Sequence, residues 1–356
     1  MWFTSDNAGP AHPSVIDALA RANEGYTGSY GADPIMDAVR TRIRDMFEAP
    51  EAAVYLVATG TSANALALAC LCPPWATVYA SRNAHVEEDE CAAPEFFTGG
   101  AKITLLDGAH AKIDVKAFED ALAFTARAGV HNVQKGALSL TNSTEAGAIY
   151  TLGEIKALTD IARSHGIPTH LDGARFSNAL VALDCTPAEM TWKAGVDIVC
   201  FGGTKNGLMG VEAVVIFDPE KAWEFELRRK RAGHLFSKHR YLSAQMQAYL
   251  KGDLWKDMAR QANAMAARLS AGLVARGADL LHPTQANAVF ASFPRRQHQA
   301  AQAAGAQYYF WPFNQSLDGP SDERLSARLV CNWCTTEAEV DAFLSALEGA
   351  DSKAAQ

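Results

Sequence analysis

An aspartate and a lysine that each follow a short, largely apolar run are the residues of this chain best placed for chemistry. Asp172 comes directly after residues 167–171, and Lys205 follows a second run, 196–201, on a Gly-Gly-Thr turn. Buried strands that end in this way present their last residues to a site at the carboxyl edge of a sheet. A carboxylate and a lysine at such positions suit pyridoxal phosphate (PLP), whose ring nitrogen takes a carboxylate partner and whose aldehyde binds a lysine amine.

Each of these two residues also has an ordinary interpretation. An isolated aspartate often caps a helix, and an isolated lysine is usually a solvated surface charge. The surrounding residues favour the cofactor, because Asp-Gly-Ala-Arg at 172–175 and Gly-Gly-Thr-Lys at 202–205 occur together, each after a strand-like run. We therefore expect a PLP site in which Lys205 is the covalent anchor.

A turn of small residues is the expected binding place for the cofactor's phosphate. The strand-like run 54–57 is followed by Ala-Thr-Gly-Thr-Ser-Ala-Asn at 58–64 and then by an apolar helix. In such a strand-turn-helix arrangement, free backbone amides and the helix dipole bind phosphate. A tight turn alone would also need small residues, but the nearby lysine favours the phosphate site. Gly60 and Thr61 are the expected contacts.

Alternating strand-like and helix-like segments predict an α/β fold. Strand-like runs at 54–57, 77–80, 101–106, 137–141, 167–171 and 196–201 alternate with helix-like stretches at 114–127, 154–165 and 186–194. This alternation is typical of a mainly parallel sheet sandwiched by helices. A long amphipathic segment, 241–273, then leads to a smaller β-rich part. We predict an N-terminal arm and large PLP-binding domain over 1–245 and a small α+β domain over 246–356.

Composition and charge exclude several classes of protein. The chain has 356 residues, a net charge of −8 and a pI near 5.7, and its basic residues are scattered apart from 228–231. Nucleic acid is therefore a poor candidate partner. The first residues have neither the basic nor the apolar segment of a signal peptide, and no apolar run approaches the ~18 residues that span a bilayer. We expect a cytoplasmic enzyme.

The seven cysteines predict reduced thiols, because their number is odd and a secretion signal is not expected. Cys331 and Cys334 have the CxxC spacing found in redox and zinc sites. A second CxxC does not accompany them, and Cys331 shares one face of a predicted strand with Trp333. Small buried hydrophobes are the favoured interpretation, and no metal site is predicted.

Four motifs together resemble the L-threonine aldolases, fold-type I PLP-dependent enzymes close to the β-eliminating lyases. The motifs are LDGAR at 171–175, GGTK at 202–205, YGADP at 30–34 and ATGTSAN at 58–64. The similarity extends from SDN at 5–7 to ARLV at 327–330. It implies the fold-type I transferase fold and cleavage of β-hydroxy-L-amino acids, such as threonine and allo-threonine, to glycine and an aldehyde. It also implies a homodimer or homotetramer with sites near subunit interfaces.

The resemblance assigns cofactor contacts to individual residues. Asp172 would keep the ring nitrogen protonated, Arg175 would contact the ring's phenolic oxygen, and Thr204 would assist at the phosphate. His85 matches a histidine whose imidazole lies flat against the ring, although a lone histidine is more often structural than catalytic. Glu90 matches an acidic position in the family, and the sequence suggests no separate role for it.

Further residues are implied as substrate contacts: Ser5, Tyr30, Thr144 and Arg328. Ser5 and Arg328 would hold the α-carboxylate, since an arginine fork pairs bidentately with a carboxylate. Tyr30 lies in a loop that reaches toward the site of a neighbouring subunit. Thr144 stands where many family members have a histidine, and its hydroxyl would bond the substrate hydroxyl. Because a hydroxyl is a poor base near neutral pH, His85 is the leading candidate for the base.

Three alternatives to a general threonine aldolase remain. An aldolase specialised for phenylserine would use the same residues on aromatic substrates. An aminotransferase or a β-eliminating lyase shares the fold but releases an oxo acid or ammonia. A protein that only binds PLP as a carrier is disfavoured, because such a protein needs no clamp for a substrate carboxylate.

Overall fold

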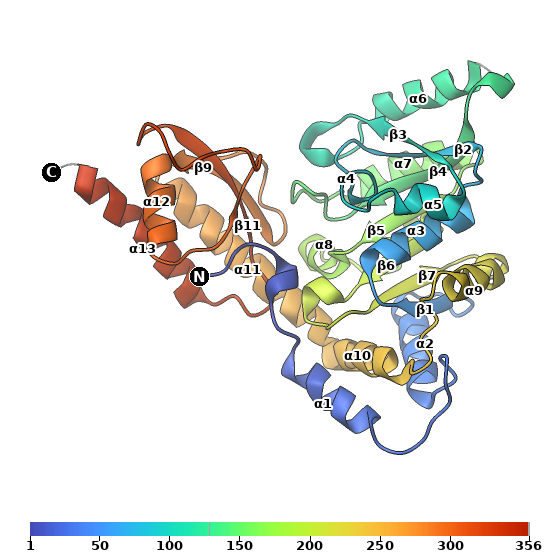
Figure 1. The fold of residues 1–356 in the computed structure, drawn as a ribbon. Coiled ribbons are helices and arrows are strands. Elements are labelled where there is room, and N and C mark those ends of the chain that lie inside the picture. Colours follow the sequence, from blue (N-terminus) through green and yellow to red (C-terminus); the bar gives the residue numbers. More distant parts are fainter. Residues whose placement is uncertain (128, 355–356) are drawn as a thin grey trace.

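The computed structural model describes residues 1–127 and 129–354, with side chains described up to residue 348. Its larger part is built around a seven-stranded sheet of order β1-β7-β6-β5-β4-β2-β3 (Figure 1). The strands are β1 (Ala53–Val57), β2 (Ala76–Ser81), β3 (Lys102–Leu106), β4 (Gln134–Thr141), β5 (Thr169–Gly173), β6 (Ile198–Gly202) and β7 (Glu212–Ile216). Strands β2 to β6 pair in parallel, whereas β7 is antiparallel to β1 and β6. The predicted mainly parallel sheet is confirmed.

Helices fill most of the remaining described chain. The α-helices are α1 (Pro13–Ala22), α2 (Pro34–Met46), α3 (Gly60–Leu71), α4 (His85–Glu88), α5 (Ala93–Thr98), α6 (Val115–Arg127), α7 (Leu152–Ser164), α8 (Phe176–Leu183), α9 (Ala222–Arg231), α10 (Arg240–Leu250), α11 (Leu254–Ala275), α12 (Arg295–Ala303) and α13 (Glu337–Ala354). The 3-10 helices are η1 (Asp6–Ala8), η2 (Ala109–Ala111), η3 (Gly129–His131), η4 (Trp192–Ala194), η5 (Thr204–Asn206), η6 (Pro219–Lys221) and η7 (Lys251–Asp253). None of these helices combines the length and apolarity that crossing a bilayer requires.

Helices cover both faces of the large sheet, because successive residues of a strand point to opposite sides. In β6, Ile198 and Cys200 pack into the core that includes α3, whereas Val199 and Phe201 pack into the core on the other face. Every residue of β6 is buried, as expected for a parallel strand covered on both sides. Helix α3 is itself buried over nearly its whole length, so it forms an inner layer between the sheet and α5 and α9.

A second, smaller unit is built on a four-stranded antiparallel sheet of order β10-β11-β9-β8. Its strands are β8 (Asp279–Leu280), β9 (Ala288–Pro294), β10 (Tyr309–Phe310) and β11 (Arg324–Val330). The N-terminal arm packs here as well, since Phe3 lies in the same core as Val289 and Phe343 and pairs with Gln307 through its backbone. The arm then runs from this unit past the large sheet to α1 (Figure 1).

Two expected helices differ in the structure. The helix expected at 186–194 is wrong, because Thr191 has φ −124° and ψ −107°, and only the short η4 follows it. The helix between β5 and β6 is instead α8, which is followed by Asp184 in a left-handed conformation. The single amphipathic segment expected at 241–273 is divided into α10 and α11, since Gly252 has a positive φ of 61° between them.

Candidate functional site

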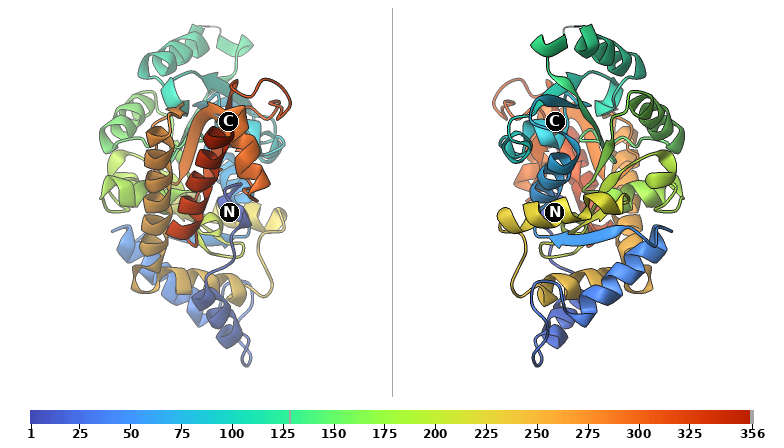
Figure 2. Two further views of the ribbon diagram at one scale, coloured as in Figure 1. Left: turned by 90° about the vertical axis from the view of Figure 1, so that its left-hand side faces the viewer. Right: turned by 90° about the vertical axis from the view of Figure 1, so that its right-hand side faces the viewer.

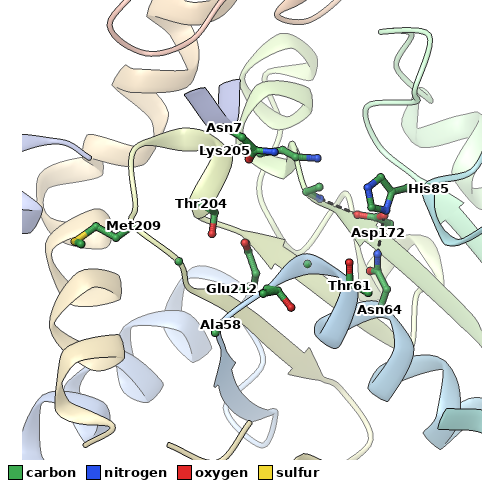
Figure 3. Close-up of a pocket in the computed structure, with 14 residues that line it drawn as sticks. Asn7, Ala58, Thr61, Asn64, His85, Asp172, Thr204, Lys205, Met209 and Glu212 are labelled. Carbon is green, nitrogen blue, oxygen red and sulfur yellow. Dashed lines mark hydrogen bonds between the residues drawn. The ribbon is translucent and has the colours of Figure 1, made fainter. Parts of the chain in front are cut away.

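Asp172 and Lys205 lie at the carboxyl ends of neighbouring strands and line the same cavities. β5 pairs in parallel with β6, with Asp172 opposite Cys200, and Lys205 follows β6 on η5. Both residues line a cavity of about 360 Å³ and an adjoining one of about 270 Å³. In Figure 3 the Lys205 side chain extends toward the side of the first cavity where Asp172 and His85 lie. The structure thus brings together the acid and the lysine that sequence reasoning singled out.

A hydrogen-bonded chain of side chains joins Asp172 to His85. Asp172 Oδ2 accepts from Asn64 Nδ2 at 2.9 Å, and the same amide donates to Glu90 Oε1 at 2.8 Å. Glu90 Oε1 lies 2.8 Å from His85 Nδ1. The second carboxylate oxygen of Asp172 accepts from the amide of Ala174 at 2.9 Å. Asn64, which sequence reasoning missed, and Glu90, which it matched without a role, therefore orient Asp172 and His85.

This chain of contacts changes the protonation of its members. The hydrogen bond to Glu90 raises the pKa of His85, because the carboxylate favours the protonated imidazole; burial opposes this effect. Burial raises the pKa of Glu90. A raised histidine pKa leaves less of the neutral imidazole at neutral pH, so His85 is well held in position but is a poorer base than an unperturbed histidine.

Lys205 is placed in surroundings that favour its neutral, nucleophilic form. Burial lowers the pKa of the amine, and the positive charge of Arg175 lowers it further. The carboxylates of Asp6, Asp172 and Glu212 act in the opposite direction without cancelling the decrease. A lysine amine must lose its proton before it attacks a carbonyl, so this setting suits a covalent cofactor anchor.

The turn that carries Lys205 is held by Glu212, a buried residue of β7. Glu212 Oε2 accepts from the amide of Gly203 at 2.6 Å, and Thr204 also hydrogen-bonds to this carboxyl group. Burial raises the pKa of Glu212 to about 7. Thr204 lines the first cavity, as expected, but part of its hydroxyl's bonding capacity is used by Glu212 and by the amide of Val211. Sequence reasoning missed Glu212, which lies in an otherwise apolar strand.

The start of α3 leaves backbone amides for an anion. Thr59 caps the helix, and its Oγ1 and carbonyl oxygen accept from the amides of Ser62 and Ala63 at 3.2 and 3.1 Å. The amides of Gly60 and Thr61 precede these in the first turn, where helices have no internal acceptors. A Cβ added at Gly60 would meet nothing within 4 Å, so the cavity extends to the backbone at this point. Such a backbone cradle suits a phosphate group.

The second cavity contains a guanidinium group without a carboxylate partner. Arg328 on β11 lines it together with Ser5 and Arg175. Arg328 Nη1 donates to Thr4 O at 3.4 Å, and no carboxylate of the described residues forms an ion pair with this arginine. Burial lowers the pKa of Arg328 to about 10, with a further decrease caused by Arg175, so the group stays charged at neutral pH. It is therefore free to bind a small carboxylate bidentately.

Arg175, in contrast, is already paired. Its Nε and Nη2 donate to Asp6 Oδ2 and Oδ1 at 2.7 and 3.0 Å, and Asn287 Nδ2 donates to Asp6 Oδ2 at 3.1 Å. Burial alone would raise the pKa of Asp6, but the charges of Arg175 and Lys205 outweigh it and leave the pKa lowered. Asp6, next to Ser5, was missed in the sequence. A contact between Arg175 and the ring's phenolic oxygen stays a prediction, and it would use an N–H of Nη1 or the second N–H of Nη2.

Thr144 does not face either cavity, contrary to expectation. Its Oγ1 donates to the carbonyl oxygen of His110 at 2.9 Å and accepts from the amide of Ala148 at 3.2 Å. Its hydroxyl is thus used inside the loop, and the side chain is buried. Its two neighbours, Ser143 and Glu145, line the second cavity instead. The expected hydrogen bond from Thr144 to a substrate hydroxyl is therefore wrong in this structure.

Tyr30 lines neither cavity of its own chain. Its ring is 46% exposed, with Lys230 Nζ 4.9 Å from the ring centroid. It belongs to the connection between α1 and α2, which projects from the end of the molecule opposite α6 (Figure 2). Tyr26 in the same connection is fully exposed. The contact of Tyr30 with the site of a neighbouring subunit stays a prediction.

Comparison with known proteins shows the family of this chain. The beta-eliminating lyase family matches the chain over residues 3–295. This chain belongs to the beta-eliminating lyase family. A low specificity L-threonine aldolase of Pseudomonas aeruginosa is 39% identical to this lyase over 335 residues, 94% of this chain and 93% of that protein.

Two further relatives match this chain over almost its whole length. A low specificity L-threonine aldolase of a Pseudomonas species is 38% identical over 340 residues, 95% of this chain and 94% of that protein. The structure of a threonine aldolase of Leishmania major has a TM-score of 0.89, with 28% sequence identity and 98% coverage of both chains. The expected fold-type I architecture is thereby confirmed.

The residues of this lyase fit PLP, the cofactor of its family. Asp172, oriented by two amide donors, is available to the ring nitrogen. Lys205, with its lowered pKa, is the amine that would anchor the cofactor. The open backbone at Gly60 and Thr61 would receive the phosphate. His85 lines both cavities and is held by Glu90, as a group lying against the ring would need to be.

Proposed function

We propose that this member of the beta-eliminating lyase family cleaves the Cα–Cβ bond of β-hydroxy-L-amino acids, among them threonine and allo-threonine, to glycine and an aldehyde. The observation that carries the proposal is the free guanidinium of Arg328 in the cavity that also contains Lys205 and Asp172. A carboxylate clamp beside the anchoring lysine suits an amino acid substrate. The similarity to the Pseudomonas and Leishmania threonine aldolases supports the aldolase reaction.

Each residue of the site has a separate task in this reaction. Arg328 and Ser5 bind the α-carboxylate and so orient the bonds at Cα, which determines the bond that is cleaved. PLP, when bound, accepts the electron pair that the cleaved bond leaves at Cα. Asp172 holds the proton on the ring nitrogen. A base must also remove the β-hydroxyl proton, and His85 is the candidate that the family resemblance indicates for this role.

The decisive experiment is a product assay of the purified protein with PLP. Threonine, allo-threonine and phenylserine are supplied separately, and glycine, aldehyde, oxo acid and ammonia are quantified. The proposal requires equal amounts of glycine and aldehyde. An oxo acid would indicate an aminotransferase, and ammonia would indicate β-elimination. Cofactor binding without any product from these substrates would favour a carrier.

We also propose that the protein acts in the cytoplasm as a homodimer or homotetramer with sites near the subunit interfaces. The projecting loop with Tyr26 and Tyr30 supports this arrangement, because exposed aromatic side chains on a loop suit contact with a second copy. Light scattering of the purified holoenzyme measures the mass. A monomer at working concentration would remove Tyr30 from the proposed site.

A specific observation also favours aromatic substrates such as phenylserine. Trp311 and Phe313 line the second cavity, and their ring centroids lie 5.2 Å apart. Trp311 is supported by Phe290, at 5.9 Å between centroids, whereas Phe313 is 66% exposed. An aryl group on the substrate's Cβ would pack against these rings, and such aromatic pairs contribute about 0.5–1.5 kcal/mol beyond area burial.

Phe313→Ala is expected to lower the ratio of kcat/KM for phenylserine to that for threonine by about 3- to 10-fold. The reason is that the variant removes an aromatic contact worth up to about 1.5 kcal/mol, and about 1.4 kcal/mol corresponds to a factor of ten. Steady-state kinetics with both substrates measure the ratio. Phe124→Ala is the matched control, since Phe124 is also 66% exposed but lies on α6 outside both cavities. An unchanged ratio in Phe313→Ala would exclude Phe313 from substrate selection.

A further inference from the structure

The loop that follows β4 carries two polar atoms that the fold leaves unpaired. Ser143 Oγ and Glu145 Oε2 are shielded from bulk solvent and have no hydrogen-bond partner in the described part of the chain. Both residues line the second cavity, together with Lys205 and Arg328. A buried polar atom without a partner is destabilising, and a ligand that supplies the partner relieves this cost. The two atoms therefore mark a place for a polar group of the substrate.

We propose that Glu145 is the general base that removes the proton from the substrate's β-hydroxyl group. The proposal rests on the aldolase function proposed above. Glu145 Oε1 accepts from the amide of His85 at 2.9 Å, which fixes the carboxyl group beside the histidine and leaves Oε2 for the substrate. The hydroxyl of Ser143, next but one in the chain, is available as a second polar contact.

The proton and electrons of this step balance within the proposed reaction. The β-hydroxyl proton passes to Glu145 Oε2, and the electron pair of the O–H bond becomes the second C–O bond of the aldehyde. The Cα–Cβ bond breaks, and its electron pair passes to Cα, where PLP accepts it. Glycine is complete when Cα takes up a proton. One proton is removed and one is added, so no oxidant, reductant or other co-reactant is needed.

Glu145 suits this role better than His85. His85 Nδ1 is engaged by Glu90, and that contact raises the histidine's pKa, which favours the form that cannot accept a proton. Glu145 Oε2 accepts no hydrogen bond from the residues that the structure describes. Burial raises the pKa of Glu145 to about 7, and a base works best when its pKa lies near the operating pH. His85 then keeps its place against the ring and orients the substrate.

The charged groups around Glu145 determine the pH dependence. Burial raises the pKa of Glu145 most, and the negative charge of Asp172 raises it further. The hydrogen bond from the backbone amide of His85 and the positive charge of the protonated His85 side chain lower it. Arg175 and Tyr150 are the other titratable groups that interact with this carboxyl group. Glu145 is therefore protonated below about pH 7 and charged above it. A rate that depends on Glu145 as a base should rise with pH through this value.

Glu145→Gln tests the assignment, because glutamine keeps an acceptor oxygen for the His85 amide but takes up no proton. We expect kcat for aldehyde release from threonine to fall by on the order of 10²-fold or more. In Glu145→Gln the rise of kcat/KM near pH 7 should disappear, whereas in His85→Asn this rise should remain. Exchange of the α-proton of glycine with solvent needs no hydroxyl base. The ratio of this exchange to aldehyde release should therefore rise by on the order of 10²-fold in Glu145→Gln.

A measurement without turnover makes the test independent of activity and includes its own control for folding. In the substrate-free holoenzyme, infrared difference spectra should show a protonated-carboxyl band that titrates near pH 7 and is missing in Glu145→Gln. The band of Glu212, whose pKa is also about 7, should remain in both proteins. Glu87→Gln is the matched control, since Glu87 is exposed on the same helix as His85 and lines neither cavity.

Failure of the Glu145 assignment can be distinguished from failure of the proposed aldolase function. If the wild-type protein releases glycine and aldehyde and Glu145→Gln keeps its rate and its pH dependence, Glu145 is not the base. If the wild-type protein releases no aldehyde from any of the three substrates, the proposed function itself fails. A Glu145→Gln variant that loses activity but also loses the Glu212 band or PLP binding would point to a structural role and would overturn the assignment.

Discussion

Lys205→Ala is expected to reduce turnover by on the order of 10⁴-fold or more and to remove the visible absorption band of lysine-bound PLP. The cofactor's aldehyde needs a nearby amine, and the structure provides Lys205, whose pKa is lowered first by burial and then by Arg175. The variant should fold normally, because none of the described residues forms an ion pair with this lysine and its side chain faces the cavities.

Absorption spectra and aldehyde release of the purified variant test this result together with a thermal unfolding curve. Lys102→Ala is a suitable control, since Lys102 is exposed at the start of β3 and lies outside both cavities. Wild-type turnover in Lys205→Ala would make the central assignment of the site untenable. Loss of folding in the variant would instead require Lys205→Arg, which keeps the positive charge but provides no comparable nucleophile.

Asp172→Asn should still bind PLP but lower kcat by on the order of 10²-fold or more, with a much smaller change in KM. A neutral amide does not hold the proton on the ring nitrogen, so the cofactor accepts electrons from Cα less readily. The substitution also affects the fold. Both oxygens of Asp172 accept hydrogen bonds, from Asn64 and from the amide of Ala174, and an asparagine has one oxygen for these two donors. We expect a loss of about 1–3 kcal/mol in the free energy of unfolding.

Steady-state kinetics at saturating PLP and denaturant unfolding separate the two effects of this variant. Asp184→Asn is the control, because Asp184 is exposed at the end of α8 and has a left-handed conformation that asparagine also adopts readily. If Asp172→Asn were as active as wild type, Asp172 would be a structural residue that only holds Asn64 and the turn after β5.

Local sequence pattern was sufficient to locate the acid, the lysine and the phosphate turn. Asp172 lies near the end of β5 and Lys205 follows the end of β6, and the carboxyl ends of neighbouring parallel strands meet at one edge of a sheet. Gly60 and Thr61 follow a strand and begin a helix. These features depend on neighbours along the chain, so they could be predicted without knowledge of the tertiary structure.

Partners that come from distant segments could not be predicted in this way. Arg175 pairs with Asp6, which is 169 residues away, and Asp6 also binds Asn287 of the smaller unit. Asn64 joins Asp172 to Glu90 across three segments. Glutamates, asparagines and aspartates are common in any sequence, and only the packing of α3, β5 and the N-terminal arm determines which of them meet.

The loop after β4 shows most clearly what could be predicted from the sequence and what required the tertiary structure. The sequence by itself shows that this loop follows a strand-like run at 137–141 and that it contains hydroxyl and carboxyl groups. Only the tertiary structure decided which of three successive residues line the cavity. Thr144 bonds to the carbonyl oxygen of His110, a contact between two loops, and this turns Ser143 and Glu145 toward the second cavity. The direction of a loop side chain follows from its through-space hydrogen bonds, because a loop has no fixed period like that of a strand or a helix.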